Sequence, residues 1–133
     1  MMRKVLLDTD VTIWLLKKKE SYVQTFIAAQ KKGYEFLLSP LVSAEIYTGA
    51  FKHEYPTIEQ FFSLLTPLVL DTETGKLAGE YANQYRKAYN KISLEDYLLA
   101  ATAVQEKAWL WTDNQKHYPM PDIRLFSDER LIQ

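Results

Sequence analysis

The sequence predicts an α/β fold, specifically a three-layer α/β/α sandwich with a mostly parallel central sheet. Two observations carry this prediction. Short apolar runs alternate along the chain with longer segments whose apolar residues recur at helical spacing. Several of the apolar runs also stop abruptly at polar residues just before a helical pattern begins. At 133 residues the chain has the size of one domain, so we expect a single domain over residues 1–133.

Each expected element follows from local spacing and from start or stop signals. The expected strands are residues 4–7, 34–38, 67–70, 109–112 and, at one edge, 123–126. The expected helices are residues 10–16, 21–32, 39–51, one that begins at 56, 74–90 and 94–107. Ser39 before Pro40 is typical of a helix start, and Thr57 followed by Gln60 has the spacing of a capping box.

Composition excludes several classes of protein and of site. The sequence has no cysteine, which rules out disulfides, thiolate metal sites and cysteine nucleophiles. A formal charge of −1 gives no global basic field for nucleic acid, and the lysine clusters at 17–19 and 31–32 are typical of solvated faces. The first seven residues are too short for a signal peptide, and no apolar run has the length of a membrane span. We therefore expect a cytoplasmic protein that makes no membrane contact.

Polar side chains follow the expected strands where a parallel sheet presents its ligand-binding edge. Right-handed crossovers bring the ends of the first, second and fourth strands to one rim of the sheet. The residues expected there are Asp8, Thr9 and Asp10 after the first strand, Glu45 in the next helix, Asp96 near a helix start, and Thr112, Asp113 and Asn114 after the fourth strand.

Such a cluster of carboxylates predicts a divalent cation. Close carboxylates repel one another and lose hydration, so a stable cluster needs protons or cations. Oxygen ligands without thiolates or a histidine cluster favour Mg²⁺ or Mn²⁺ over Zn²⁺. His53 and His117 are far apart in sequence, and we expect both at the surface or rim. A site of this kind can activate water and hydrolyse a phosphodiester.

Each acid also has a purely structural explanation. Asp8 is a suitable N-cap, and Glu45 has the spacing of an ordinary exposed helix residue. Ser93 and Asp96 have the spacing of a capping box, which would place an acid at the positive end of a helix. Asp113 and its neighbour are common turn residues.

Four segments in the same order resemble the PIN domain, and in particular the VapC-type toxin ribonucleases of type II toxin–antitoxin modules. These segments are residues 6–13, 43–49, 96–103 and 110–114, so the resemblance extends from near the start to about residue 118. It implies that Asp8 is the first metal ligand, Glu45 the second acid, and Asp96 the third acid and second principal metal ligand.

Two adjacent residues, Asp113 and Asn114, are candidates for the fourth position of the site. Family members generally carry asparagine or aspartate two residues after the threonine of the last segment, a position that Asn114 holds here, while Asp113 lies one residue earlier. Asn114 is therefore the preferred residue for this position, and Asp113 is kept as a second candidate. Thr9, Asp10 and Thr112 are expected to orient the ligands.

The resemblance also implies an activity and partners. It implies cleavage of RNA inside the chain by water, with Mg²⁺ or Mn²⁺ as cofactor. It further implies a homodimer and a cognate antitoxin protein that occupies a groove near the acids. Trp14, Tyr47, Phe51 and the tyrosines at 81, 85 and 89 are candidates to line this groove, while the favoured interpretation of the tyrosines is core packing with their hydroxyls at the rim.

Two alternatives remain at this point. Residues 8–12 also resemble the opening motif of haloacid-dehalogenase-like phosphatases, in which Asp8 would be the nucleophile and Asp10 the general acid. That interpretation leaves the Asp96 segment unexplained. Asp10→Asn would distinguish the two interpretations, since a phosphatase should lose its activity whereas a PIN nuclease should tolerate the substitution better. The second alternative is a catalytically idle PIN module that only binds RNA or protein.

Overall fold

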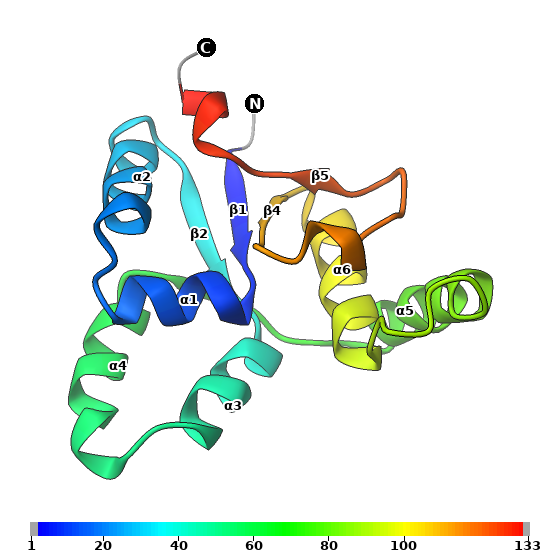
Figure 1. The fold of residues 1–133 in the computed structure, drawn as a ribbon, viewed down its shortest axis with the longest axis horizontal. Helices are drawn as coiled ribbons and strands as arrows, with labels where there is room; N and C mark the ends of the chain where they lie inside the picture. The colour runs from blue at the N-terminus through cyan, green and yellow to red at the C-terminus, as the bar shows by residue number, and fades with distance from the viewer. Residues whose placement is uncertain (1–2, 132–133) are drawn as a thin grey trace.

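The chain is built around a parallel sheet in the computed structural model, which describes residues 3–131 and is drawn in Figure 1. Residues 1–2 and 132–133 of the predicted domain lie outside this range. The five strands have the order β3-β2-β1-β4-β5, and every neighbouring pair is parallel. Their bounds are β1 Lys4–Leu7, β2 Glu35–Leu38, β3 Thr66–Pro67, β4 Trp109–Trp111 and β5 Arg124–Leu125. The predicted α/β architecture is confirmed.

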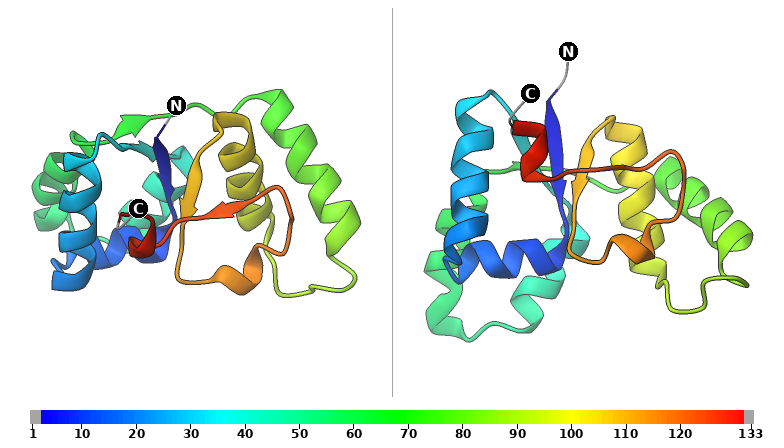
Figure 2. Two further views of the ribbon diagram at one scale, coloured as in Figure 1. Left: turned by 90° about the horizontal axis from the view of Figure 1, so that it is seen from above. Right: turned by 45° about the horizontal axis from the view of Figure 1, so that its top comes forward.

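Within the described range, six α-helices connect these strands in two groups. They are α1 Thr9–Leu16, α2 Glu20–Lys31, α3 Pro40–Thr48, α4 Tyr55–Phe62, α5 Thr72–Tyr85 and α6 Leu94–Glu106. Helix α1 contacts α2, α3 and α4, whereas α5 and α6 pack on each other and α6 contacts β4. The chain moves from β1 to β3 in one direction and returns to β4 in the other, so right-handed crossovers place the two groups on opposite faces. Figure 2 shows both groups from two further directions.

Some element boundaries differ from those predicted. The third strand was predicted at 67–70 but pairs only at Thr66–Pro67, with one further bond from Leu68 N to Leu38 O. Its partner β2 ends at Leu38, so the next residues have no strand to pair with, and Val69 is 88% exposed. The fifth strand is likewise restricted to Arg124–Leu125.

The observed starts of α3 and α4 show which of the predicted capping signals are used. The Ser39 side chain accepts a hydrogen bond from Leu41 N, so the predicted cap is confirmed. The capping box predicted at Thr57 is wrong, because α4 already begins at Tyr55 and Thr57 lies inside it. Proline at the second position of α4 makes the earlier start favourable, since its missing N–H would be unpaired there anyway.

Further along the chain, α3 ends at Thr48, three residues before the predicted end, with Gly49 as its C-cap. Helix α5 runs from Thr72 to Tyr85, so it starts two residues before the predicted range and ends five residues before the predicted end. At its start the Asp71 side chain accepts a hydrogen bond from Thr74 N.

The central strand and one helix form the middle of the core. Val5, Leu6 and Leu7 of β1 are fully shielded from solvent, as expected for a strand covered on both faces. Helix α6 contributes Ala100 and Ala101, both at 0% exposure, and these small side chains allow the helix to approach the sheet closely. Because α6 lies against β4, which pairs with β1, its first turn lies near the carboxyl end of β1.

A membrane-spanning helix is not found in residues 3–131, where none of the helices combines the required length with sufficient apolar character.

Candidate active site

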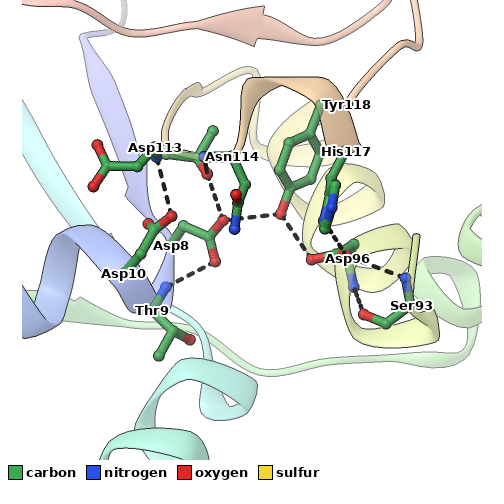
Figure 3. A network of polar contacts seen from close by, with 10 residues as sticks. Asp8, Thr9, Asp10, Ser93, Asp96, Asp113, Asn114, His117 and Tyr118 are labelled. Atoms are coloured by element: carbon green, nitrogen blue, oxygen red, sulfur yellow. Dashed lines mark hydrogen bonds and ion pairs between the residues drawn. The ribbon is translucent and has the colours of Figure 1, made fainter. Parts of the chain in front are cut away.

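Asp8 lies where β1 ends and α1 begins, and Figure 3 shows its carboxylate at the centre of a hydrogen-bond network. Its Oδ1 accepts a bond of 2.7 Å from Thr9 N, which makes Asp8 the N-cap of α1. Its Oδ2 accepts a bond of 2.7 Å from Thr112 Oγ1, and its backbone N–H donates to Trp111 O. The predicted cap function and a site position therefore coexist in one side chain.

Asp96 lies in the first turn of α6, where its carboxylate both caps the helix and contacts residues that follow β4. Ser93 N donates to Asp96 Oδ2 at 3.1 Å and Asp96 N donates to Ser93 Oγ at 3.1 Å, so the capping box is present. His117 Nδ1 lies 3.0 Å from the same Oδ2. The other oxygen, Oδ1, faces Tyr118.

Tyr118 connects the two carboxylates, although sequence reasoning did not single it out. Its hydroxyl lies 3.0 Å from Asp8 Oδ2 and 3.3 Å from Asp96 Oδ1, and the residue is only 5% exposed. Burial, followed by the charges of the two carboxylates, raises the pKa of Tyr118 far above its usual value. The phenol therefore stays protonated and acts as a hydrogen-bond donor.

His117 was expected at the surface or rim, and its half-buried ring lies beside Asp96, whereas His53 is exposed. The residue types and spacing of residues 117–118 carry no catalytic signal. The path of the chain after β4 places the His117 ring beside Asp96 and the Tyr118 hydroxyl between Asp96 and Asp8.

Glu45 is placed near the start of α1, outside the network around Tyr118. It is an exposed residue of α3, and its Oε1 accepts a hydrogen bond of 2.9 Å from Thr9 Oγ1. Since Thr9 directly follows Asp8, this bond links Glu45 to the beginning of the site. Its carboxylate has one side-chain donor, so it stays accessible to solvent and to a substrate.

Asp10 is turned toward the loop that follows β4. Its Oδ1 accepts from Val11 N at 2.7 Å and its Oδ2 accepts from Asp113 N at 3.1 Å. Burial, and then the charge of Asp8, raises the pKa of Asp10 to about 6. Asp10 therefore connects the start of α1 to the loop that follows β4.

The two candidates for the fourth position point in different directions. Figure 3 shows the Asn114 side chain directed toward Asp8 and Tyr118, while the Asp113 carboxylate points away from them. Asp113 Oδ1 instead accepts a hydrogen bond of 2.7 Å from Tyr22 OH. Asn114 N donates to Thr112 Oγ1 at 3.0 Å, which fixes the start of the loop. Of the two side chains, that of Asn114 is therefore the one directed at the carboxylate network.

This difference predicts opposite outcomes for two substitutions. Asn114→Ala removes the amide directed at Asp8, and we expect ribonuclease activity to fall roughly 10- to 100-fold, the usual effect of losing a group beside a metal ligand. Asp113→Asn keeps a side-chain acceptor for Tyr22, and we expect its activity to stay within about twofold of wild type. Initial rates of RNA cleavage would test both, and the reverse order of effects would assign the fourth position to Asp113.

The chemistry of these residues fits a divalent cation that keeps several waters. In the part of the chain that the structure describes, no three acidic or histidine side chains lie close enough to hold an ion together. Asp8 and Asp96, joined through the Tyr118 hydroxyl, leave two carboxylates with the Asn114 amide alongside. In proteins Mg²⁺ is commonly bound by one or two carboxylates and keeps water molecules as its other ligands. Two carboxylates and one amide are therefore a suitable ligand set for Mg²⁺.

A cavity of about 380 Å³ opens beside Glu45, between α1, α3 and α4. Its lining is mainly apolar and includes Ile13, Leu16, Ile46 and Ile58. The aromatic residues predicted for a groove do not line this cavity. Tyr47 packs on Tyr55 and Phe62, Trp14 stacks on Tyr22, and Phe51 is 71% exposed beside His53.

Two residues of the predicted tyrosine stripe, Tyr81 and Tyr85, lie on α5, which belongs to the other group of helices, and Tyr89 follows the end of this helix. Tyr81 is buried and donates to Asp122 Oδ2, while Tyr85 and Tyr89 continue the row outward. Tyr81 therefore belongs to the core, Tyr89 is exposed, and none of the three rings lines the cavity beside Glu45.

Comparison with known proteins identifies the class to which this fold and site belong. The PIN domain family model matches residues 5–121. The chain therefore belongs to the PIN-domain family. The haloacid-dehalogenase alternative, which depended on short local similarity at residues 8–12, does not describe the family of this chain.

Individual proteins with similar sequences or folds indicate which kind of PIN-domain protein this chain resembles. Ribonuclease VapC19 of Mycobacterium tuberculosis is 31% identical over 90% of this chain and 96% of its own length. Ribonuclease VapC10 of the same species is 29% identical over 87% and 86%. The toxin–antitoxin complex from Klebsiella pneumoniae contains a chain with the same fold, at a TM-score of 0.70 and 20% identity over 93% of this chain and 97% of that one. The predicted resemblance to VapC-type ribonucleases is confirmed.

Proposed function

We propose that this chain is a metal-dependent endoribonuclease that hydrolyses RNA phosphodiester bonds and is the toxin of a toxin–antitoxin pair, with one PIN domain across residues 1–133. One observation carries the proposal. Asp8, after β1, and Asp96, on α6, share a single buried hydroxyl, with the Asn114 amide directed at the same place. PIN-domain membership and the ribonuclease relatives support the choice of RNA.

In this proposal Asp8 and Asp96 hold the cation, which is Mg²⁺ or alternatively Mn²⁺. When bound, the ion supplies the positive charge that activates water and stabilises charge developing on the phosphate. Asn114 offers a neutral oxygen beside the two carboxylates. Thr9 and Thr112 hold Asp8 in place through Oδ1 and Oδ2 respectively.

Glu45 has a different role in the same reaction. Its exposed carboxylate carries one hydrogen bond from a side chain, that of Thr9, and has acceptor capacity left. It can therefore accept the proton that the attacking water releases. Asp10 stays outside the reaction, because both of its oxygens bind backbone N–H groups.

The partners follow from the same family relationship. We propose that a cognate antitoxin binds across the apolar cavity beside Glu45, which would place a protein segment next to the acids. The Klebsiella complex, which contains a chain of the same fold, supports this partner. A homodimer is proposed from the resemblance alone.

The test of the proposed function is cleavage of structured RNA by the purified chain with and without metal. With Mg²⁺ or Mn²⁺ we expect internal cuts in tRNA or rRNA, and with excess chelator we expect the rate to fall to background. Returning metal after chelation should restore the rate, which separates metal dependence from damage. Cleavage that persists in chelator, or no cleavage of any structured RNA with either metal, would contradict the proposal.

A further inference from the structure

Within residues 3–131, Tyr118 is the one side chain that is hydrogen-bonded to both proposed metal ligands. Asp8 and Asp96 come from distant parts of the chain, and each has an oxygen within hydrogen-bonding distance of the Tyr118 hydroxyl. The ring is nearly inaccessible to solvent, so packing fixes the position of that hydroxyl. Neither the capping of α1 nor the capping of α6 requires it, since Thr9 and Ser93 supply those contacts.

The hydrogen bonds around Asp8 leave its two oxygens in different states. Oδ2 accepts from Thr112 Oγ1 and from Tyr118 OH, which uses both of its lone pairs. Oδ1 accepts only from Thr9 N and keeps one lone pair. The oxygen of Asp8 that can bind a cation without losing a protein contact is therefore Oδ1.

Asp96 shows the same division. Its Oδ2 accepts from Ser93 N and lies 3.0 Å from His117 Nδ1, so this oxygen is held from two directions. Its Oδ1 has only the longer contact of 3.3 Å with the Tyr118 hydroxyl. Because a phenol has a single proton and the contact with Asp8 is the shorter one, that proton belongs to Asp8 and leaves Asp96 Oδ1 open.

We infer that Tyr118 is a positioning residue, whose hydroxyl fixes the carboxylate of Asp8 relative to that of Asp96 so that one oxygen of each is presented to a divalent cation. This inference rests on the proposed metal-dependent function. Removing the hydroxyl leaves Thr112 as the only donor to Asp8 Oδ2, so the carboxylate gains freedom that metal binding must then remove. Loss of such a supporting hydrogen bond typically weakens metal binding 10- to 100-fold.

The experiment is isothermal titration of Mn²⁺ into the purified chain and into Tyr118→Phe, which keeps the ring and removes one oxygen. The matched control is Tyr81→Phe, because Tyr81 is also buried and also donates to a carboxylate, that of Asp122, at 3.0 Å. Thermal unfolding without metal confirms that all three proteins are folded. We expect roughly tenfold or greater weakening of Mn²⁺ binding in Tyr118→Phe and none in Tyr81→Phe.

A second readout separates positioning from participation in the reaction. At saturating Mn²⁺ we expect Tyr118→Phe to recover most of the wild-type kcat with an unchanged KM for RNA. Equal Mn²⁺ affinity in wild type and Tyr118→Phe would overturn the inference and leave the proposed function intact. Tighter binding would also overturn it, since the hydroxyl would then be competing with the cation. If the wild-type chain binds no Mn²⁺ at all, the proposed metal site fails and the inference fails with it.

Discussion

Asp8→Asn is expected to reduce RNA cleavage by roughly 10³-fold, through the loss of about 4 kcal/mol of charge stabilisation at a metal ligand. The substitution is informative because asparagine is as good an N-cap as aspartate. Its amide oxygen can keep the bond from Thr9 N, while its NH₂ group donates to the hydroxyls of Thr112 and Tyr118, which can accept. We therefore expect the free energy of unfolding to change by less than about 1 kcal/mol.

The measurements are initial cleavage rates at fixed Mg²⁺ and a denaturant titration of each protein. Asp71→Asn is the matched control, since Asp71 caps α5 through Thr74 N and lies outside the site. The control should keep wild-type activity. If Asp8→Asn retains activity, or loses it only because it unfolds, then Asp8 is a structural cap and the metal site lies elsewhere.

Asp96→Asn is expected to have the second largest effect, a loss of roughly 10²-fold that corresponds to about 3 kcal/mol. The amide oxygen can still accept from Ser93 N, so the capping box of α6 survives while the negative charge disappears. The substitution thus separates the two explanations that sequence alone leaves open for Asp96.

For this variant we would measure the Mg²⁺ concentration that gives half-maximal cleavage, together with the maximal rate. A metal ligand predicts that more Mg²⁺ is needed, whereas a pure capping residue predicts the same requirement. The control is Glu95→Gln, because Glu95 is the exposed neighbour in the same first turn. A wild-type Mg²⁺ requirement in Asp96→Asn would contradict its assignment as a ligand.

The parts of the fold that sequence predicted are those decided by local chemistry. Residues 5–7 are apolar and stop at an acid, and together with Lys4 they form β1. Ser39 before Pro40 starts a helix because both residues favour that position whatever surrounds them. Thr66–Pro67 was misplaced because the length of an edge strand depends on where its partner ends, which no local pattern records.

The candidate site likewise has features that local sequence predicts and features that depend on tertiary contacts. That Asp8 and Asp96 lie close together was predictable, because Asp8 follows an apolar strand of the parallel sheet and Asp96 precedes the apolar part of a helix that packs on this sheet. The directions of the Asp113 and Asn114 side chains were not predictable from residue type, since the direction of a side chain in a loop depends on contacts such as that of Asp113 with Tyr22 from a different helix. Tyr118 and His117 carried no signal, because their importance comes only from the path of the chain after β4.

That path also determines when the site can exist during synthesis. Tyr118 and Asp8 are 110 residues apart in sequence, and Thr112 and Asp8 are 104 residues apart. A growing chain therefore contains Asp8 well before the residues that hold its carboxylate, and α6 with Asp96 is synthesised between them. The contacts between these acids and Tyr118 form only after nearly the whole domain has left the ribosome, so incomplete chains of this protein lack the assembled site.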